Sequence, residues 1–282
     1  MQDMWFVAGA AILAVGLGLG FWRWWPRLEG VSAAARVSLI VSTVGALVGA
    51  PFWWADAPAS FAWDLPLLAS RMLAAAALAF GVSGLIVLQR PSPAGGRLQA
   101  LLVAVYLVPL AAAALGLHRD RFDPAAAITW GFFAAVLGLG ATALVALREP
   151  RAATVEPVAA GSFEASYLHA AGVILGLWGL ALFIRPDAPW PMIFNWPQDP
   201  LTSRLIATML ITLSVALFAA RRDRALRLQV HALAASYGLG VSVAAQVNMV
   251  ASRPFPVFYM LAFGAIWVLS VLMIFKPARI RP

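Results

Sequence analysis

Nine runs of apolar residues, each about twenty residues long and separated by polar loops, constrain this chain of 282 residues more than any other feature. A helix needs about twenty apolar residues to cross the hydrocarbon core of a bilayer, where its backbone groups must be hydrogen-bonded within the helix. The sequence therefore predicts an all-α polytopic membrane bundle. Its nine transmembrane helices are expected near residues 4–24, 37–54, 67–88, 98–117, 125–147, 166–184, 201–220, 228–250 and 257–275.

Composition points the same way and excludes several classes of protein. Hydrophobic residues make up 62% of the chain and charged residues 11%, whereas soluble domains hold about 45–50% and about 25%. The net charge of +8 comes from arginines that flank the apolar runs, so it indicates membrane topology and not nucleic-acid binding. The chain has no cysteine, which excludes disulfides, thiol catalysis and cysteine-bound metals. The sequence also lacks any recognisable catalytic or metal-binding motif built from other residues. We therefore expect a protein without catalytic chemistry.

The distribution of basic residues over the loops predicts the orientation. Lys and Arg near the ends of membrane spans are retained on the cytoplasmic side. Fourteen of the 20 basic residues, Arg148 and Lys276 among them, fall in loops on one side, and six fall in loops on the other. We therefore expect the N-terminus outside and the C-terminus in the cytoplasm, in a bacterial inner (cytoplasmic) membrane whose lipid bilayer is the main partner.

An internal duplication divides the chain. Residues 61–91 resemble residues 194–223, because both begin with Phe-x-Trp, continue through Ser-Arg and form an apolar run that ends at arginine. The match pairs the third span with the seventh, so both copies have the same orientation across the membrane. The expected organisation is a leading helix in residues 1–30, followed by two tandem, parallel four-helix repeats in residues 31–150 and 151–282.

The outer loops before the third and seventh spans concentrate tryptophan, proline and charged residues. One interpretation is a pair of vestibules in which tryptophan rings and Asp and Arg side chains hold a ligand. The alternative is an aromatic belt in the headgroup layer, with each arginine clamped by a nearby aspartate. A third interpretation assigns the two arginines to an anionic solute or a lipid phosphate. The candidate ligand-binding residues of these loops are Trp53, Trp54, Trp63, Asp64, Arg71, Trp190, Trp196, Asp199 and Arg204.

Two histidines, His169 and His231, lie about one turn into helices that begin on the cytoplasmic side. Histidines at one level on neighbouring helices are what axial ligation of a b-type haem requires. Arg36 and Gln99 occupy similar levels in the other repeat, so hydrogen bonding at the cytoplasmic headgroup boundary, or from helix to helix, is an alternative. A proton-linked role is a third interpretation.

The remaining polar residues within the spans are few. Gln246 and Asn248, near the outer end of the eighth span, are candidates for the polar lining of a path. Asp and Glu are absent from mid-membrane depth, which disfavours an ion-coupled pump. Glycines within the spans, such as Gly138, Gly179 and Gly238, are expected to permit close helix packing.

These features favour permease- or channel-type transport of a small or lipid-like solute through a site between the two repeats. Two alternatives stay open. One is an accessory or anchoring subunit that contacts other membrane subunits. The other is an electron-transfer subunit that binds b-type haem or a quinone through His169 and His231.

Overall fold

The structure is a computed structural model that describes residues 2–57, 60–149, 161–186, 199–251 and 257–275. Within these residues the chain forms nine α-helices and no strand. The helices are α1 (Gln2–Trp24), α2 (Ala33–Trp54), α3 (Leu67–Gln89), α4 (Pro93–Leu117), α5 (Ala127–Arg148), α6 (Ser162–Ile184), α7 (Pro200–Arg222), α8 (Arg227–Val250) and α9 (Val257–Phe275). Each contains a segment long and apolar enough to cross a membrane. The predicted all-α bundle is confirmed for the described part of the chain, and these helices are consistent with a multi-pass membrane protein.

Several helices begin earlier than the apolar runs because polar residues cap them. Ser32 accepts a hydrogen bond from the amide of Ala35 at the start of α2 (3.3 Å), and Ser92 accepts one from Gly95 at the start of α4 (3.0 Å). Asp199 caps α7 in the same way. Such an acceptor satisfies amides of the first helical turn that have no partner within the helix. The apolar runs therefore mark the part that crosses the membrane, and the caps set the ends of the helices.

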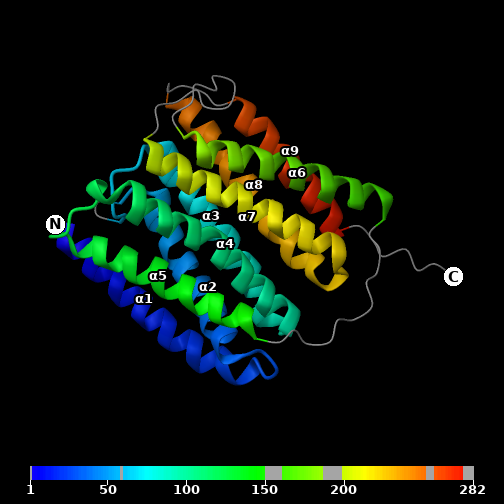
Figure 1. Ribbon diagram of the computed structural model, residues 1–282, viewed down its shortest axis with the longest axis horizontal. Helices are drawn as coiled ribbons and strands as arrows, with labels where there is room; N and C mark the ends of the chain where they lie inside the picture. Colours follow the sequence, from blue (N-terminus) through cyan, green and yellow to red (C-terminus); the bar gives the residue numbers. More distant parts are fainter. Residues whose placement is uncertain (1, 58–59, 150–160, 187–198, 252–256, 276–282) are drawn as a thin grey trace.

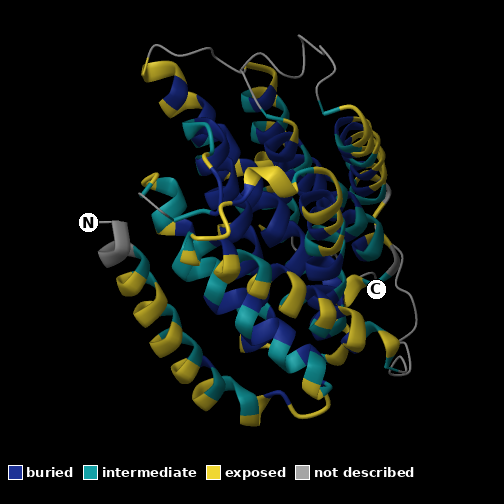
Figure 2. Ribbon diagram, turned by 60° about the vertical axis from the view of Figure 1, so that its left-hand side comes forward, coloured by how far each residue is buried: buried dark blue, intermediate teal, exposed yellow. Residues whose placement is uncertain are grey.

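The helices pack in pairs. α2 packs on α3, α4 on α5, α6 on α7 and α8 on α9, while α3 packs on α8 and α4 packs on α7 across the middle of the bundle. Figure 1 shows α1 and α5 at one edge of the bundle and α6 and α9 at the opposite edge. Figure 2 shows that α1 is exposed along most of its length, whereas the helices at the centre are largely buried.

Glycine permits close approach within two of these pairs. A Cβ atom at Gly238 of α8 would lie 2.6 Å from the carbonyl oxygen of Phe263 in α9. A Cβ atom at Gly179 of α6 would lie 2.9 Å from the carbonyl oxygen of Ala207 in α7. The predicted packing role is confirmed for these two glycines. It is wrong for Gly138, which is exposed and whose Cβ would meet no atom within 4 Å.

A buried polar cluster joins four helices. Gln99 of α4 accepts hydrogen bonds from Ser83 of α3 (3.1 Å) and Gln229 of α8 (3.3 Å), and its amide donates to Ser42 of α2 (3.4 Å). All four side chains are buried, and Gln99 is 0% exposed. Gln99 therefore forms helix-to-helix hydrogen bonds inside the bundle, and its depth in the membrane stays a prediction. An unpaired amide in an apolar interior is costly. These bonds therefore favour one rotation of each of the four helices about its own axis.

Candidate functional site

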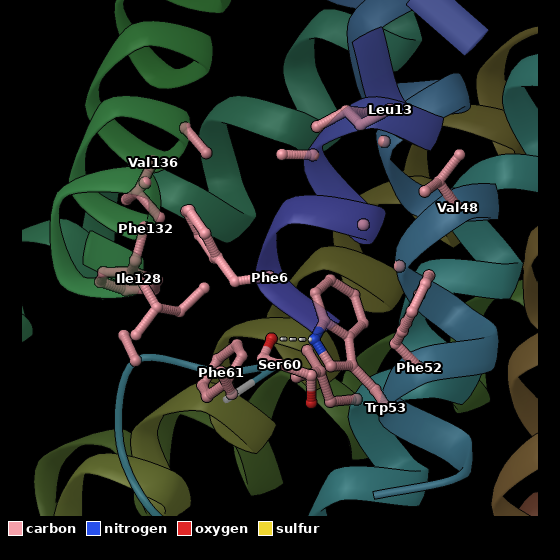
Figure 3. A pocket seen from close by; sticks show the side chains of 18 of the residues that line it. Phe6, Leu13, Val48, Phe52, Trp53, Ser60, Phe61, Ile128, Phe132 and Val136 are labelled. Atoms are coloured by element: carbon pink, nitrogen blue, oxygen red, sulfur yellow. Dashed lines mark hydrogen bonds between the residues drawn. The ribbon is translucent and has the colours of Figure 1, made fainter. Parts of the chain in front are cut away.

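A pocket of about 450 Å³ lies among α1, α2, α4 and α5. Phe6 and Leu13 of α1 line it on one side, Val48 of α2 on another, and Phe132 and Val136 of α5 on a third. Figure 3 shows these side chains around the space, with Phe6 projecting from α1 into the pocket. All of these positions lie within helices that are apolar enough to cross a membrane.

The lining of the pocket is almost entirely apolar. Among the described residues that line it, only Trp53, Ser60 and Tyr106 have a polar side-chain atom. The indole nitrogen of Trp53 already donates to the backbone oxygen of Ser60 (2.8 Å). Small residues create part of the space, because a Cβ atom at Gly45 or Gly131 would meet nothing within 4 Å. A cavity of this size and character suits the hydrocarbon part of a molecule.

Aromatic rings form the floor of the pocket. Trp63 is 7% exposed, and its ring centroid lies 4.4 Å from that of Phe61, 5.5 Å from Phe122 and 5.4 Å from Phe132. Its indole nitrogen donates to the hydroxyl of Thr202 in α7 (3.2 Å). Trp63 therefore lies beneath the pocket and is hydrogen-bonded to α7, while Phe61 and Phe132 form part of the pocket wall.

The other candidate tryptophans have different positions. Trp53 lines the pocket, and its ring packs edge-to-face on Phe61 at 5.9 Å between centroids. Trp54 is half-buried and packs against the main hydrophobic core. Trp190 and Trp196 lie outside the described residues. The structure thus brings Trp53 and Trp63 together at the end of the pocket.

The candidate aspartates do not form equivalent contacts. Asp199 caps α7 and forms an ion pair with Arg121 in the loop between α4 and α5 (3.8 Å). Asp64 is exposed. In the described part of the chain, the Nε and Nη1 atoms of Arg71 are buried without a hydrogen-bond partner. The expected clamp between Asp64 and Arg71 is therefore not formed through these atoms.

Arg204 instead connects three parts of the structure. Its Nε donates to the carbonyl oxygen of Phe183 at the end of α6 (3.2 Å), and its Nη1 contacts Nε2 of His118 just after α4. A guanidinium group only donates, so His118 accepts through Nε2 and is neutral in this contact. The contact links the end of α4 to the first turns of α7.

We expect this contact to make stability depend on pH. Burial and the charge of Arg204 lower the pKa of His118 from its ordinary value of 6.5; Arg121 acts in the same direction, while Asp120 and Asp199 oppose it. The unfolded chain therefore binds a proton at His118 at a higher pH than the folded chain does. The stabilising contribution is complete above pH 6.5 and is lost as the pH falls through the lower pKa of the folded state.

Thermal unfolding of the detergent-solubilised protein from about pH 8 to about pH 5 measures this loss. The matched control is His118→Gln, whose amide oxygen accepts from Arg204 but does not titrate. We expect a smaller decline in unfolding temperature for this variant than for the natural chain. Equal declines would show that His118 is not responsible.

The structure places the two histidines proposed for haem in different surroundings. His169 is exposed, and its Nδ1 lies 3.3 Å from Nη1 of Arg221. His231 is 2% exposed, and its Nε2 lies 3.0 Å from Oε1 of Glu164. Glu164 also forms an ion pair with Arg227 (3.6 Å). Haem ligation by this pair stays a prediction, and the visible absorption spectrum of the purified protein decides it.

The two amides near the outer end of α8 do not share one surface. Gln246 is exposed, whereas Asn248 is 3% exposed. Residues two apart on a helix point in different directions, so they do not line one path together. Neither residue lines the pocket.

The pocket does not lie where the sequence analysis expected a site. α7 contributes only Leu205 to its lining, and α6, α8 and α9 contribute no residue. The contact between α3 and α8 is tightly filled, because a Cβ atom at Gly240 would lie 2.5 Å from the Cβ of Ala75. Apart from Leu205, the candidate site therefore lies within the segment that contains α1 to α5.

Sequence reasoning missed most of the pocket wall. A signal was present in the spacing of small residues, with Gly45 four residues before Gly49 and Gly131 four residues before Ala135. Such spacing places small residues on one face of a helix, where they either permit close packing or leave space. The two outcomes cannot be distinguished without the positions of the neighbouring helices.

Comparisons of this chain with protein-family models, with curated proteins and with solved structures gave no match.

Proposed function

We propose that this protein holds the hydrocarbon part of a lipid-like molecule in the pocket among α1, α2, α4 and α5. The observation that carries the proposal is a cavity lined almost entirely by apolar side chains, most of them on helices apolar enough to cross a membrane. Such binding is one step in the transport of a lipid-like solute, which is the function that the sequence favours. The proposal keeps the expected class of solute but moves the site away from the middle of the bundle.

The chemistry of the pocket supports an apolar ligand. Burying a charged or strongly polar group is costly unless the protein supplies partners, and the described residues of the lining offer no charged side chain. A volume of about 450 Å³ lies within the range of about 300–1,000 Å³ typical of small-molecule sites. One hydrocarbon chain or a compact apolar ring system therefore suits the space better than a polar metabolite does.

The pattern of helix contacts supports the tandem repeat that we also propose. The pairs α2–α3 and α4–α5 have counterparts in α6–α7 and α8–α9, and the contact of α3 with α8 has its counterpart in that of α7 with α4. A twofold axis along the membrane normal relates contacts in this way. With the basic residues on the cytoplasmic side, the start of α1 and the end of α2 face outward, and the pocket opens in the outer leaflet.

The test is the molecule that copurifies with the protein. We expect native mass spectrometry in a mild detergent to detect an apolar adduct on the natural chain, and solvent extraction to identify its class. Replacing Gly45 by leucine fills the pocket, because the new side chain enters space that is now empty. The occupancy of the adduct should fall about tenfold, which corresponds to about 1.4 kcal/mol of binding free energy.

Gly138→Leu is the matched control, since this glycine also has free space around it but does not line the pocket. We expect it to retain the adduct at the level of the natural chain. A natural chain without any apolar adduct, or equal adducts on both variants, would contradict the proposed function.

A further inference from the structure

We infer that the pocket is entered sideways from the hydrocarbon layer, through an opening between α1 and α5, so that its ligand is a chain of a membrane lipid. This inference rests on the proposed function and names the class and source of the ligand. Three features of the described residues support it: the divergence of α1 from α2, the exposure of the lining residues at the opening, and the closed end of the pocket.

α1 packs most closely on α2 toward the end that leads into the next loop. Cβ atoms at Gly16 and Gly20 would lie 3.0 Å and 3.1 Å from side-chain atoms of Val44, so the two helices touch there. At Gly9, nearer the start of α1, the nearest atom would be the ring of Phe52 at 3.9 Å. The helices therefore separate toward the start of α1, and the pocket occupies the widening space.

The residues that are both exposed and part of the lining mark the opening. They are Ala10 of α1 and Gly131 and Ala135 of α5. With a rise of about 1.5 Å per residue, Ala10 and Ala135 each lie about 12 Å from the start of their helices. The hydrocarbon core is about 30 Å thick, so both positions lie at the depth of acyl chains and well below the headgroups.

Residues 60–62 of the loop after α2 cover the end of the pocket beside the end of α2. The backbone oxygen of Ser60 accepts from Trp53, and the ring of Phe61 packs on that indole. Phe61 in turn packs on Trp63 and Phe132. A water-soluble solute would have to pass this aromatic layer, whereas an acyl chain already lies beside the opening.

Photo-crosslinking in lipid nanodiscs tests the inference. The reporter is Leu110, which lines the pocket from α4 and is 1% exposed, so a lipid reaches it only through the pocket. A phospholipid with a diazirine in the middle of its acyl chain should crosslink to Leu110, as peptide mapping by mass spectrometry will show. A water-soluble diazirine should label the exposed Asp64 loop and leave Leu110 unlabelled.

Tryptophan at the opening should block this access. We expect Ala135→Trp to lower crosslinking at Leu110 about tenfold, and Ala10→Trp to do the same from the opposite side if the first variant does not fold. Gly138→Trp, three residues further along α5 and outside the pocket, is the control that keeps full crosslinking. Leu110 labelled by the water-soluble reagent, or by the lipid equally in all variants, would overturn the inference.

These outcomes are distinct from failure of the proposed function. Crosslinking at Leu110 without a copurifying adduct would mean that lipid enters the pocket but is not held there. An adduct on the purified protein, together with aqueous labelling of Leu110, would mean that the pocket holds an apolar ligand but is entered from water.

Discussion

Replacing Gly238 by leucine is expected to force α8 and α9 apart and to lower the free energy of unfolding by about 3 kcal/mol or more. The new Cβ atom would lie 2.6 Å from the carbonyl oxygen of Phe263 and 2.8 Å from the amide nitrogen of Trp267. Both are backbone atoms of α9, so a change of rotamer cannot relieve the contact. Thermal unfolding in detergent, followed by tryptophan fluorescence, measures the loss, and a poor yield of folded protein is the extreme form of the same result.

Gly138→Leu makes the same chemical change where the structure leaves room. No atom lies within 4 Å of the new Cβ, and the position is exposed to the surroundings of the bundle. We expect its effect to stay within about 0.5 kcal/mol. Similar losses at both positions would show that helix propensity, and not the contact of α8 with α9, governs the result.

Replacing Glu164 by leucine is expected to destabilise the protein by about 3–5 kcal/mol, because the change removes the carboxylate shared by two buried side chains. Glu164 accepts from His231, which is 2% exposed, and pairs with Arg227, which is 9% exposed. The remaining guanidinium keeps its bond to the carbonyl oxygen of Ala220 but loses the carboxylate of Glu164. Unfolding in detergent measures the effect.

A double-variant cycle separates the ion pair from general damage. The double variant Glu164→Leu with Arg227→Leu removes both charges, and we expect it to recover most of the lost stability, to within about 1–2 kcal/mol of the natural chain. Additive losses from the two single changes would contradict this account. They would show that each side chain acts through other contacts and that the pair does not connect α6 to α8.

Some site residues could be predicted from the sequence and others could not. Trp53 was a candidate from its loop, and it lines the pocket. Trp63 was a candidate for the same reason, yet it lies beneath the pocket, where it is hydrogen-bonded to Thr202 of α7. This position could not be predicted, because Thr202 is 139 residues away in the chain. Neither Glu164 nor His118 stands out in the sequence, whereas the structure gives Glu164 a buried partner and His118 a specific one. No local pattern identifies such long-range partners.

The amino-acid sequence by itself determined the length, number and apolar character of the helices in the described part of the chain. These properties follow from local composition, since each run must satisfy its own backbone in a medium without water. Tertiary structure alone decided which glycines touch a neighbour, as Gly238 does, and which face open space, as Gly45 does. It also decided that the pocket lies beside α1 and not between the two halves. Both depend on how helices tilt and rotate against one another, which is a property of the packed side chains of several helices together.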